Sequence, residues 1–320
     1  MIETPTATAF KIDSDDTLEE VDAPVLSEEQ KSEKMKLVES DLFLVKQKPI
    51  TAKMSTTIKH LKAQGGRLAP FRGLHVSIIY HLAHSFILNV FTSRGSHPLI
   101  HALVTILATV GLCHIQMTWN HIVISAPSTK RWWRRFPSVK AAKNIIVPTA
   151  IYAIAAQAAF YVPATLFVTV HDTLRDPSAY GSNPATVQKI ALVEIFLVGL
   201  IAIGTIILVV IPADVTLTRV QASMLPEEDE SIVPFDRTFA GKVKPEILGG
   251  SGAVGMLDAW RTFDRSARMR LIKLYGKIFA IQIALTFMFV FVVIGELRLI
   301  MGDDLAKVAK KIHAEFKGQY

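Results

Sequence analysis

The sequence holds one cysteine, Cys113, among 320 residues. A single cysteine excludes an internal disulfide, and because Cys113 falls in an apolar stretch it carries no signal for a cellular compartment. We find no set of nucleophile, general base and orienting group of the kind that enzyme sites need, so we expect no catalytic activity. Residues 249–252 (GGSG) lack the lysine and the serine or threonine of a phosphate-binding loop. We therefore expect no cofactor, and no nucleic acid among the partners.

The first residues carry neither the short apolar core of a secretory signal nor the basic, acid-poor composition of a transit peptide. Residues 13–33 (DSDDTLEEVDAPVLSEEQKSE) are instead acidic and hydrophilic. We expect residues 1–40 to form an acidic, disordered tail. The formal net charge of +7 must then come from the rest of the chain.

Long polar stretches are rare in the remainder, since half of the residues are hydrophobic and the mean hydropathy is +0.35. Crossing about 30 Å of hydrocarbon takes roughly 20 apolar residues in a helix. Five stretches are long enough: Gly73–Thr92, Pro98–Ser125, Ile145–Val170, Thr186–Ile211 and Tyr275–Met301. The composition predicts an all-α membrane protein with five transmembrane helices.

Several of these stretches contain polar residues, which helices surrounded by lipid avoid, so we expect them to pack around something polar. They are His75, His81, His84 and Asn89, then His114, Gln116 and His121, then Gln157, Glu194 and Gln282. His81 and His84 share a helical face without a carboxylate or thiolate nearby, which favours packing or cavity lining over a metal site. Glu194 is either a proton or cation site or lies near headgroups.

The cations gather in residues 42–72, 126–144 and 215–274, and the links 93–97 and 171–185 hold few. Five crossings place all three basic segments on one side of the membrane, as the positive-inside rule favours. The two termini would then lie on opposite faces. Each basic segment also contains a pattern typical of an amphipathic surface helix, among them residues 56–66 and 255–276. We predict another in the basic tail 302–320.

Segments of the chain can be laid over one another as a degenerate threefold repeat. WNHIVIS (119–125) ends the second stretch as PADVTLT (212–218) ends the fourth, and RWWRRF and DAWRTF follow them. DLFLVK (41–46) marks a third copy. The repeats would cover residues 41–95, 96–180 and 181–301, and the first would lack its opening helix because residues 14–40 are too polar to cross a bilayer.

This pattern resembles the mitochondrial carrier family of solute transporters, and Pro212, Asp214, Arg219 and Gln221 match its motif P-x-[DE]-x-x-[KR]-x-[KR]-x-Q. Leu217 stands where the family has its pairing cation. Phe71, Arg72 and Gly73 match the start of the family's even-numbered helices, which is associated with cardiolipin, and Tyr275 with Gly276 matches it partly. Asp172 and Arg175 fit the motif on the opposite face, where Glu296 holds a comparable position. The resemblance thus implies a carrier-like bundle of five transmembrane helices with amphipathic surface helices.

In carriers, the proline bends the helix inward, and acid–cation pairs between repeats close one gate. Here that basic-side gate would hold Pro212, Asp214, Arg219 and Gln221, with His121 at the acid position of the second repeat. The three cation positions read Leu44, Ile124 and Leu217, so no closed ring of ion pairs can form. Asp172, Arg175 and Glu296 would form the opposite gate.

The resemblance also implies a substrate cavity, with Tyr80, His81, Gln157, Tyr161 and Gln282 as its candidate lining. None of these is an arginine or lysine, which carriers of anionic metabolites use to grip their substrate. Either the solute is not strongly anionic or transport has been lost.

We therefore expect a carrier-like transporter of a small solute, in a mitochondrial membrane and in the inner rather than the outer one, with lipids such as cardiolipin as partners. The alternative is a non-transporting carrier homologue of the outer mitochondrial membrane, acting in protein insertion or membrane dynamics. A bundle without its first helix would open toward lipid. A membrane-protein partner that replaces the missing helix is therefore also possible.

Overall fold

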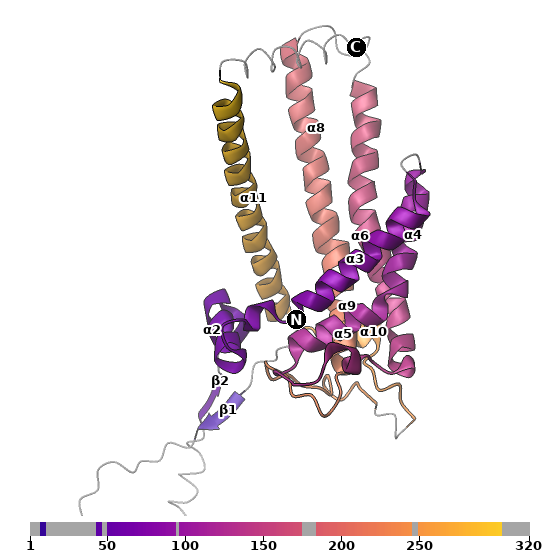
Figure 1. Ribbon diagram of the computed structural model, residues 1–320, viewed down its shortest axis with the longest axis vertical. Helices are drawn as coiled ribbons and strands as arrows, with labels where there is room; N and C mark the ends of the chain where they lie inside the picture. Colours follow the sequence, from indigo (N-terminus) through magenta and orange to yellow (C-terminus); the bar gives the residue numbers. More distant parts are fainter. Residues whose placement is uncertain are drawn as a thin grey trace, which may run out of the picture. The chain divides into compact units, whose positions relative to one another are not determined.

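The computed structural model describes residues 7–10, 43–46, 50–93, 96–174, 184–244 and 249–302 (Figure 1). Helices dominate these residues, as the sequence predicts. Strand β1 (Ala7–Phe10) pairs antiparallel with β2 (Phe43–Lys46), so a short strand falls in the tail that we expected to be disordered. The chain divides into two compact units, Met1–Phe263 and Asp264–Tyr320.

The described residues contain four helices that are long and apolar enough to cross a membrane, and a fifth candidate in a bent helix pair. In the first unit these are α3 (Leu74–Phe91), α6 (Val139–Leu174) and the continuous run of α8 (Pro184–Thr205), η4 (Ile206–Val210) and α9 (Ile211–Ser223). The second unit consists, in its described part, of α11 (Arg265–Met301). Helices α6 and α8 pack side by side (Figure 1).

The second predicted stretch is not one straight helix. It forms α4 (Pro98–Gly111) and α5 (Cys113–Ile124), which meet at Leu112 with a bend of 56°. The apolar half of the stretch is α4, while α5 carries the polar residues, among them Asn120 and His121. The bend turns these polar groups toward α9, where they find hydrogen-bond partners.

The apolar stretch ends at Ile211, but the helix runs on through Pro212 to Ser223. The turn before the proline is a π-helix, in which the amide of Ile211 donates to the carbonyl oxygen of Ile206. A proline clashes with the carbonyl four residues earlier in a regular α-helix. The wider π turn accommodates the ring, so the chain continues instead of ending.

The predicted surface helix over 56–66 is confirmed as α2 (Met54–Gly65). The one predicted over 255–276 is split into α10 (Met256–Arg261) and the start of α11 at Arg265. Phe263, which is 3% exposed, lies between the two helices.

The basic segments before α3, after α5 and after α9 lie together, as five crossings require. Arg72 donates to the backbone oxygens of Ile122 (3.0 Å) and Ala126 (3.1 Å). Ser125 and Ser231 form an isolated antiparallel bridge, and His60 Nε2 lies 2.8 Å from the oxygen of Ile232. The hydrophobic core lies beside these loops: Cys113, Met117, Ile145, Val220, Ala222, Phe239, Val254 and Ala259.

Candidate functional site

The structure brings two residues of the predicted basic-side gate together at the junction of α5 and α9. His121 Nε2 donates to the backbone oxygen of Gln221 at 2.8 Å. The side-chain oxygen of Gln221 accepts from the Asn120 amide, and Gln221 is fully buried. The junction is therefore held by buried hydrogen bonds.

Arg219, by contrast, points into the loop core. Its Nη2 donates to Thr262 Oγ1 at 2.8 Å, and its guanidinium lies 4.8 Å from the ring centre of Phe239 and 5.4 Å from that of Phe263. Leu217, at the position of the missing cation, is 1% exposed. At 3.6 residues per turn, Asp214 and Arg219 lie about 140° apart around α9, so they serve different faces.

Asp214 is half-buried on α9, which packs on α6. The phenol of Tyr152 on α6 lies within electrostatic range of both Asp214 and Tyr80. Three helices thus place polar groups near one another at this level. The sequence analysis missed Tyr152, since no motif marks it.

The predicted cavity residues of the first unit, Tyr80, His81, Gln157 and Tyr161, have different neighbours. Tyr80 is buried, edge-on to His81 at 5.3 Å and stacked on His84 at 6.0 Å, and His84 Nε2 lies 3.3 Å from Thr109 Oγ1. Tyr161 on α6 reaches His101 on α4, with 3.4 Å between Oη and Nδ1. Gln157 is partly buried on α6. Gln282 is exposed on α11, in the other unit.

The predicted gate on the opposite face falls largely outside the described part of the chain. Asp172 lies in the last turn of α6, and its side chain and all of Arg175 are outside the described residues. Glu296 is an exposed residue of α11.

Phe71, Arg72 and Gly73, the predicted lipid-binding motif, line one basic pocket of about 330 Å³ together with Lys130 and Arg135. The Nη1 atom of Arg72 is buried and has no hydrogen-bond partner among the described residues. Lys130 pairs with Glu228 and Arg135 with Asp229, so the guanidinium of Arg72 is the cation of this pocket that forms no ion pair among the described residues. Tyr275 and Gly276 belong to α11 in the second unit, so the structure does not test their predicted part in lipid binding.

Gly73 is required at this pocket for two reasons. Its φ is 79°, in the left-handed region that L residues rarely adopt. A Cβ atom there would lie 2.8 Å from Trp119 Cδ1.

The loops that close the basic side hold two groups with altered pKa values. The hydrogen bond and charge of Glu228, at 2.7 Å, raise the pKa of Lys130. Hydrogen bonds from the Thr238 hydroxyl (2.6 Å) and the Ala240 amide (2.7 Å) lower the pKa of Asp236. Asp236 thereby orders the turn that carries Phe239 to Arg219.

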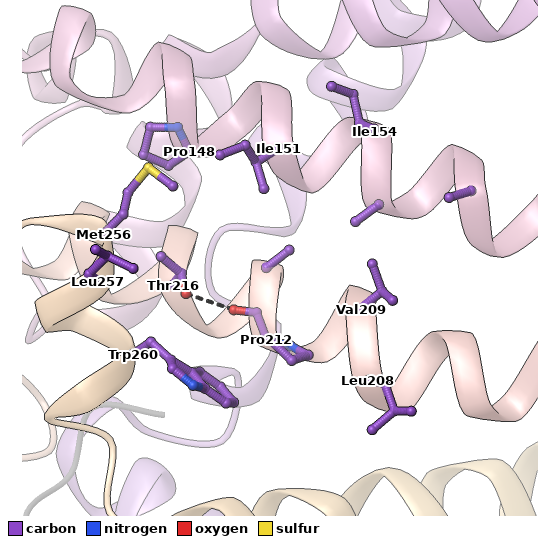
Figure 2. A pocket seen from close by; sticks show the side chains of 13 residues that line it. Pro148, Ile151, Ile154, Leu208, Val209, Pro212, Thr216, Met256, Leu257 and Trp260 are labelled. Atoms are coloured by element: carbon purple, nitrogen blue, oxygen red, sulfur yellow. Dashed lines mark hydrogen bonds between the residues drawn. The ribbon is translucent and has the colours of Figure 1, made fainter.

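A second, apolar groove of about 460 Å³ lies between α6, the η4–α9 run and α10 (Figure 2). It is lined by Pro148, Ile151, Ile154, Ala155, Ala158, Leu208, Val209, Pro212, Ala213, Thr216, Met256, Leu257 and Trp260. The sequence analysis did not predict it. The run of small residues in AIAAQAAF (153–160) was the available signal.

Comparison of the chain with described protein families, with curated proteins and with solved structures found no match.

Proposed function

We propose that this chain is a carrier-like protein of the outer mitochondrial membrane that does not transport a solute, and that it acts in protein insertion or membrane dynamics. One observation carries the proposal. The positions that would form the switchable basic-side gate are built into fixed packing: Gln221 and Leu217 are buried, and Arg219 is enclosed by Thr262, Phe239 and Phe263.

The energetic argument compares two kinds of closure. Breaking an exposed ion pair, so that both groups bind water instead, costs about 0–1 kcal/mol. A gate made of such pairs can therefore open. Separating α5 from α9 would replace the hydrogen bonds that Gln221 receives from Asn120 and His121 with bonds to water, at a net cost of about 0.5–1.5 kcal/mol each. Exposing Met117 of α5 and Val220 of α9, which belong to one buried cluster, would add about 1.5–3 kcal/mol per side chain. Alternating access at this end is therefore unfavourable.

The order of elements supports the carrier resemblance. A short surface helix precedes a long apolar helix three times along the chain: α2 before α3, η3 (Trp132–Arg135) before α6, and α10 before α11. The basic pocket around Arg72 supports an anionic phospholipid such as cardiolipin as a partner. Both features fit a membrane-embedded homologue whether or not it transports.

Transport in the inner membrane is the second candidate, favoured by Asp214. A carboxylate at membrane depth costs about 2.5–3.5 kcal/mol on insertion scales, and such residues are functional by default. Tyr152, which lies within electrostatic range of Asp214, would contact the same bound solute. That solute would be uncharged or cationic, since the candidate contacts include no arginine or lysine.

Reconstitution in sealed liposomes separates the two candidates. We expect no uptake of labelled nucleotides, keto acids or amino acids by the wild-type protein, while depletion of the protein from mitochondria lowers the integration of helix-anchored outer-membrane precursors. Uptake of a solute that Asp214→Asn abolishes, with Asp258→Asn as the matched control, would establish transport and overturn the proposal.

A further inference from the structure

We propose that the apolar groove between α6, η4–α9 and α10 binds one acyl chain of a bilayer phospholipid, whose headgroup stays at the basic surface of the membrane. This inference does not depend on the proposed function, because it rests on the shape and chemistry of the groove alone (Figure 2).

The lining offers an occupant no charge and almost no hydrogen bonding. Among the residues that the structure describes, no acidic, basic or histidine side chain lines the groove. Its one hydroxyl, that of Thr216, donates to the Pro212 oxygen of the same helix at 2.7 Å (Figure 2). An occupant is therefore held by van der Waals contact, and an empty groove would lose those contacts on every wall.

The volume distinguishes an acyl chain from a protein helix. Helices are about 10 Å across with side chains and rise 1.5 Å per residue, so ten residues fill about 1,200 Å³. The groove holds about 460 Å³, which is within the usual range for small ligands. A single hydrocarbon chain fits this space, whereas a helix could insert only part of its side chains.

The position of the groove points to the bilayer as the source of that chain. Two of its walls belong to the candidate spans Val139–Thr169 and Leu192–Ser223. Wall residues such as Ile154 and Leu208 are more than half exposed in the protein alone, so in a membrane they meet hydrocarbon. A free fatty acid would need a cation for its carboxylate, and the described part of the lining has none.

Helix α10 closes the end of the groove nearest the loops. It contributes Trp260, whose amphipathic ring favours the level of the headgroups. A phospholipid can therefore place its glycerol region beside Trp260 and extend one chain along Pro212 and Val209.

Small residues make the space, which provides the variants for a test. Ala158 on α6 and Ala213 on α9 both line the groove, so Ala158→Phe with Ala213→Phe fills it. Ala164→Phe is the matched control, because Ala164 lies exposed on the same helix as Ala158 and outside the groove. Thermal unfolding in detergent checks that all variants fold.

The experiment uses the full chain in liposomes that contain phosphatidylcholine with a diazirine in one acyl chain. Mass spectrometry after illumination should find labels concentrated in residues 148–158 and 208–216, reduced several-fold by the filling variants and unchanged by Ala164→Phe. Excess free oleate should not compete. Equal labelling of the exposed α8 face at 192–200, labelling that the filling variants leave intact, or displacement by oleate or by an apolar helical peptide would overturn the proposal.

Should the double variant fail to fold, a second measurement decides. The fluorescence of Trp260 is obtained as the difference between the wild type and Trp260→Phe. Phospholipids brominated on one acyl chain should quench this difference. Failure to quench it would count against an acyl chain beside Trp260.

Discussion

His121 on α5 and Gln221 on α9, one hundred residues apart in the sequence, are joined by a hydrogen bond of 2.8 Å from the imidazole to the backbone oxygen. Because this bond is buried, it ties the basic-side ends of two long helical segments together. A carrier gate would need these ends to separate. The bond is therefore the first contact to test.

His121→Ala should destabilise the protein by about 0.5–1.5 kcal/mol, because the buried Gln221 carbonyl loses the bond from the imidazole and keeps the one from the Met224 amide at 3.2 Å. Thermal unfolding in detergent measures the effect. His75→Ala, at an exposed position of α3, should change stability little. Equal effects of the two substitutions would show that the buried bond contributes nothing specific.

Arg135 and Asp229 form a buried ion pair with 3.0 Å between Nη2 and Oδ2, and their side chains are 5% and 10% exposed. Asp229→Asn removes one partner and leaves a buried guanidinium charge, which costs about 3–5 kcal/mol. The adjacent Glu228 pairs with Lys130 on the surface, so Glu228→Gln should cost about 0–1 kcal/mol. Chemical unfolding of both variants would refute this ranking if Glu228→Gln proved the more harmful.

Gly73→Ala should destabilise the start of α3 and distort the basic pocket. The left-handed backbone costs about 1–2 kcal/mol for a residue with a side chain, and the new methyl would also press on Trp119. Gly199→Ala, whose added methyl meets nothing within 4 Å, is the control. Unfolding and binding of cardiolipin-containing vesicles should both weaken in Gly73→Ala alone.

Asp236 should make stability depend on pH in the acidic range. The pKa of Asp236 in the folded protein is lower than its ordinary value of 3.8. Its contribution to the free energy of unfolding is therefore complete above pH 3.8 and is lost as the pH falls through the folded pKa. Asp236→Asn should therefore unfold at a lower temperature at neutral pH and lose less on acidification than the wild type. Parallel pH profiles for the two proteins would argue against this role.

Five crossings predict that residues 96 and 128 lie on opposite sides of the membrane. Cys113 is 2% exposed, so background thiol labelling should be low. A membrane-impermeant maleimide should label Ser96→Cys and Ser128→Cys from opposite sides of oriented vesicles. Labelling of both from the same side would mean that α4 and α5 form a re-entrant loop.

The sequence determined the features that depend on composition and on neighbouring residues. The length of the apolar stretches predicts the spanning helices, and the distribution of cations predicts that the basic segments lie together. The motif Phe71–Arg72–Gly73 marks residues that line one pocket. Three features were decided by residues distant in the chain or by backbone geometry that no motif encodes. The bend at Leu112 turns Asn120 and His121 toward Gln221. A π turn allows the helix to continue through Pro212. Arg219 contacts Phe239 and Thr262. The physical reason is that a buried polar group takes the partner that packing brings within reach, and only the tertiary structure defines that partner.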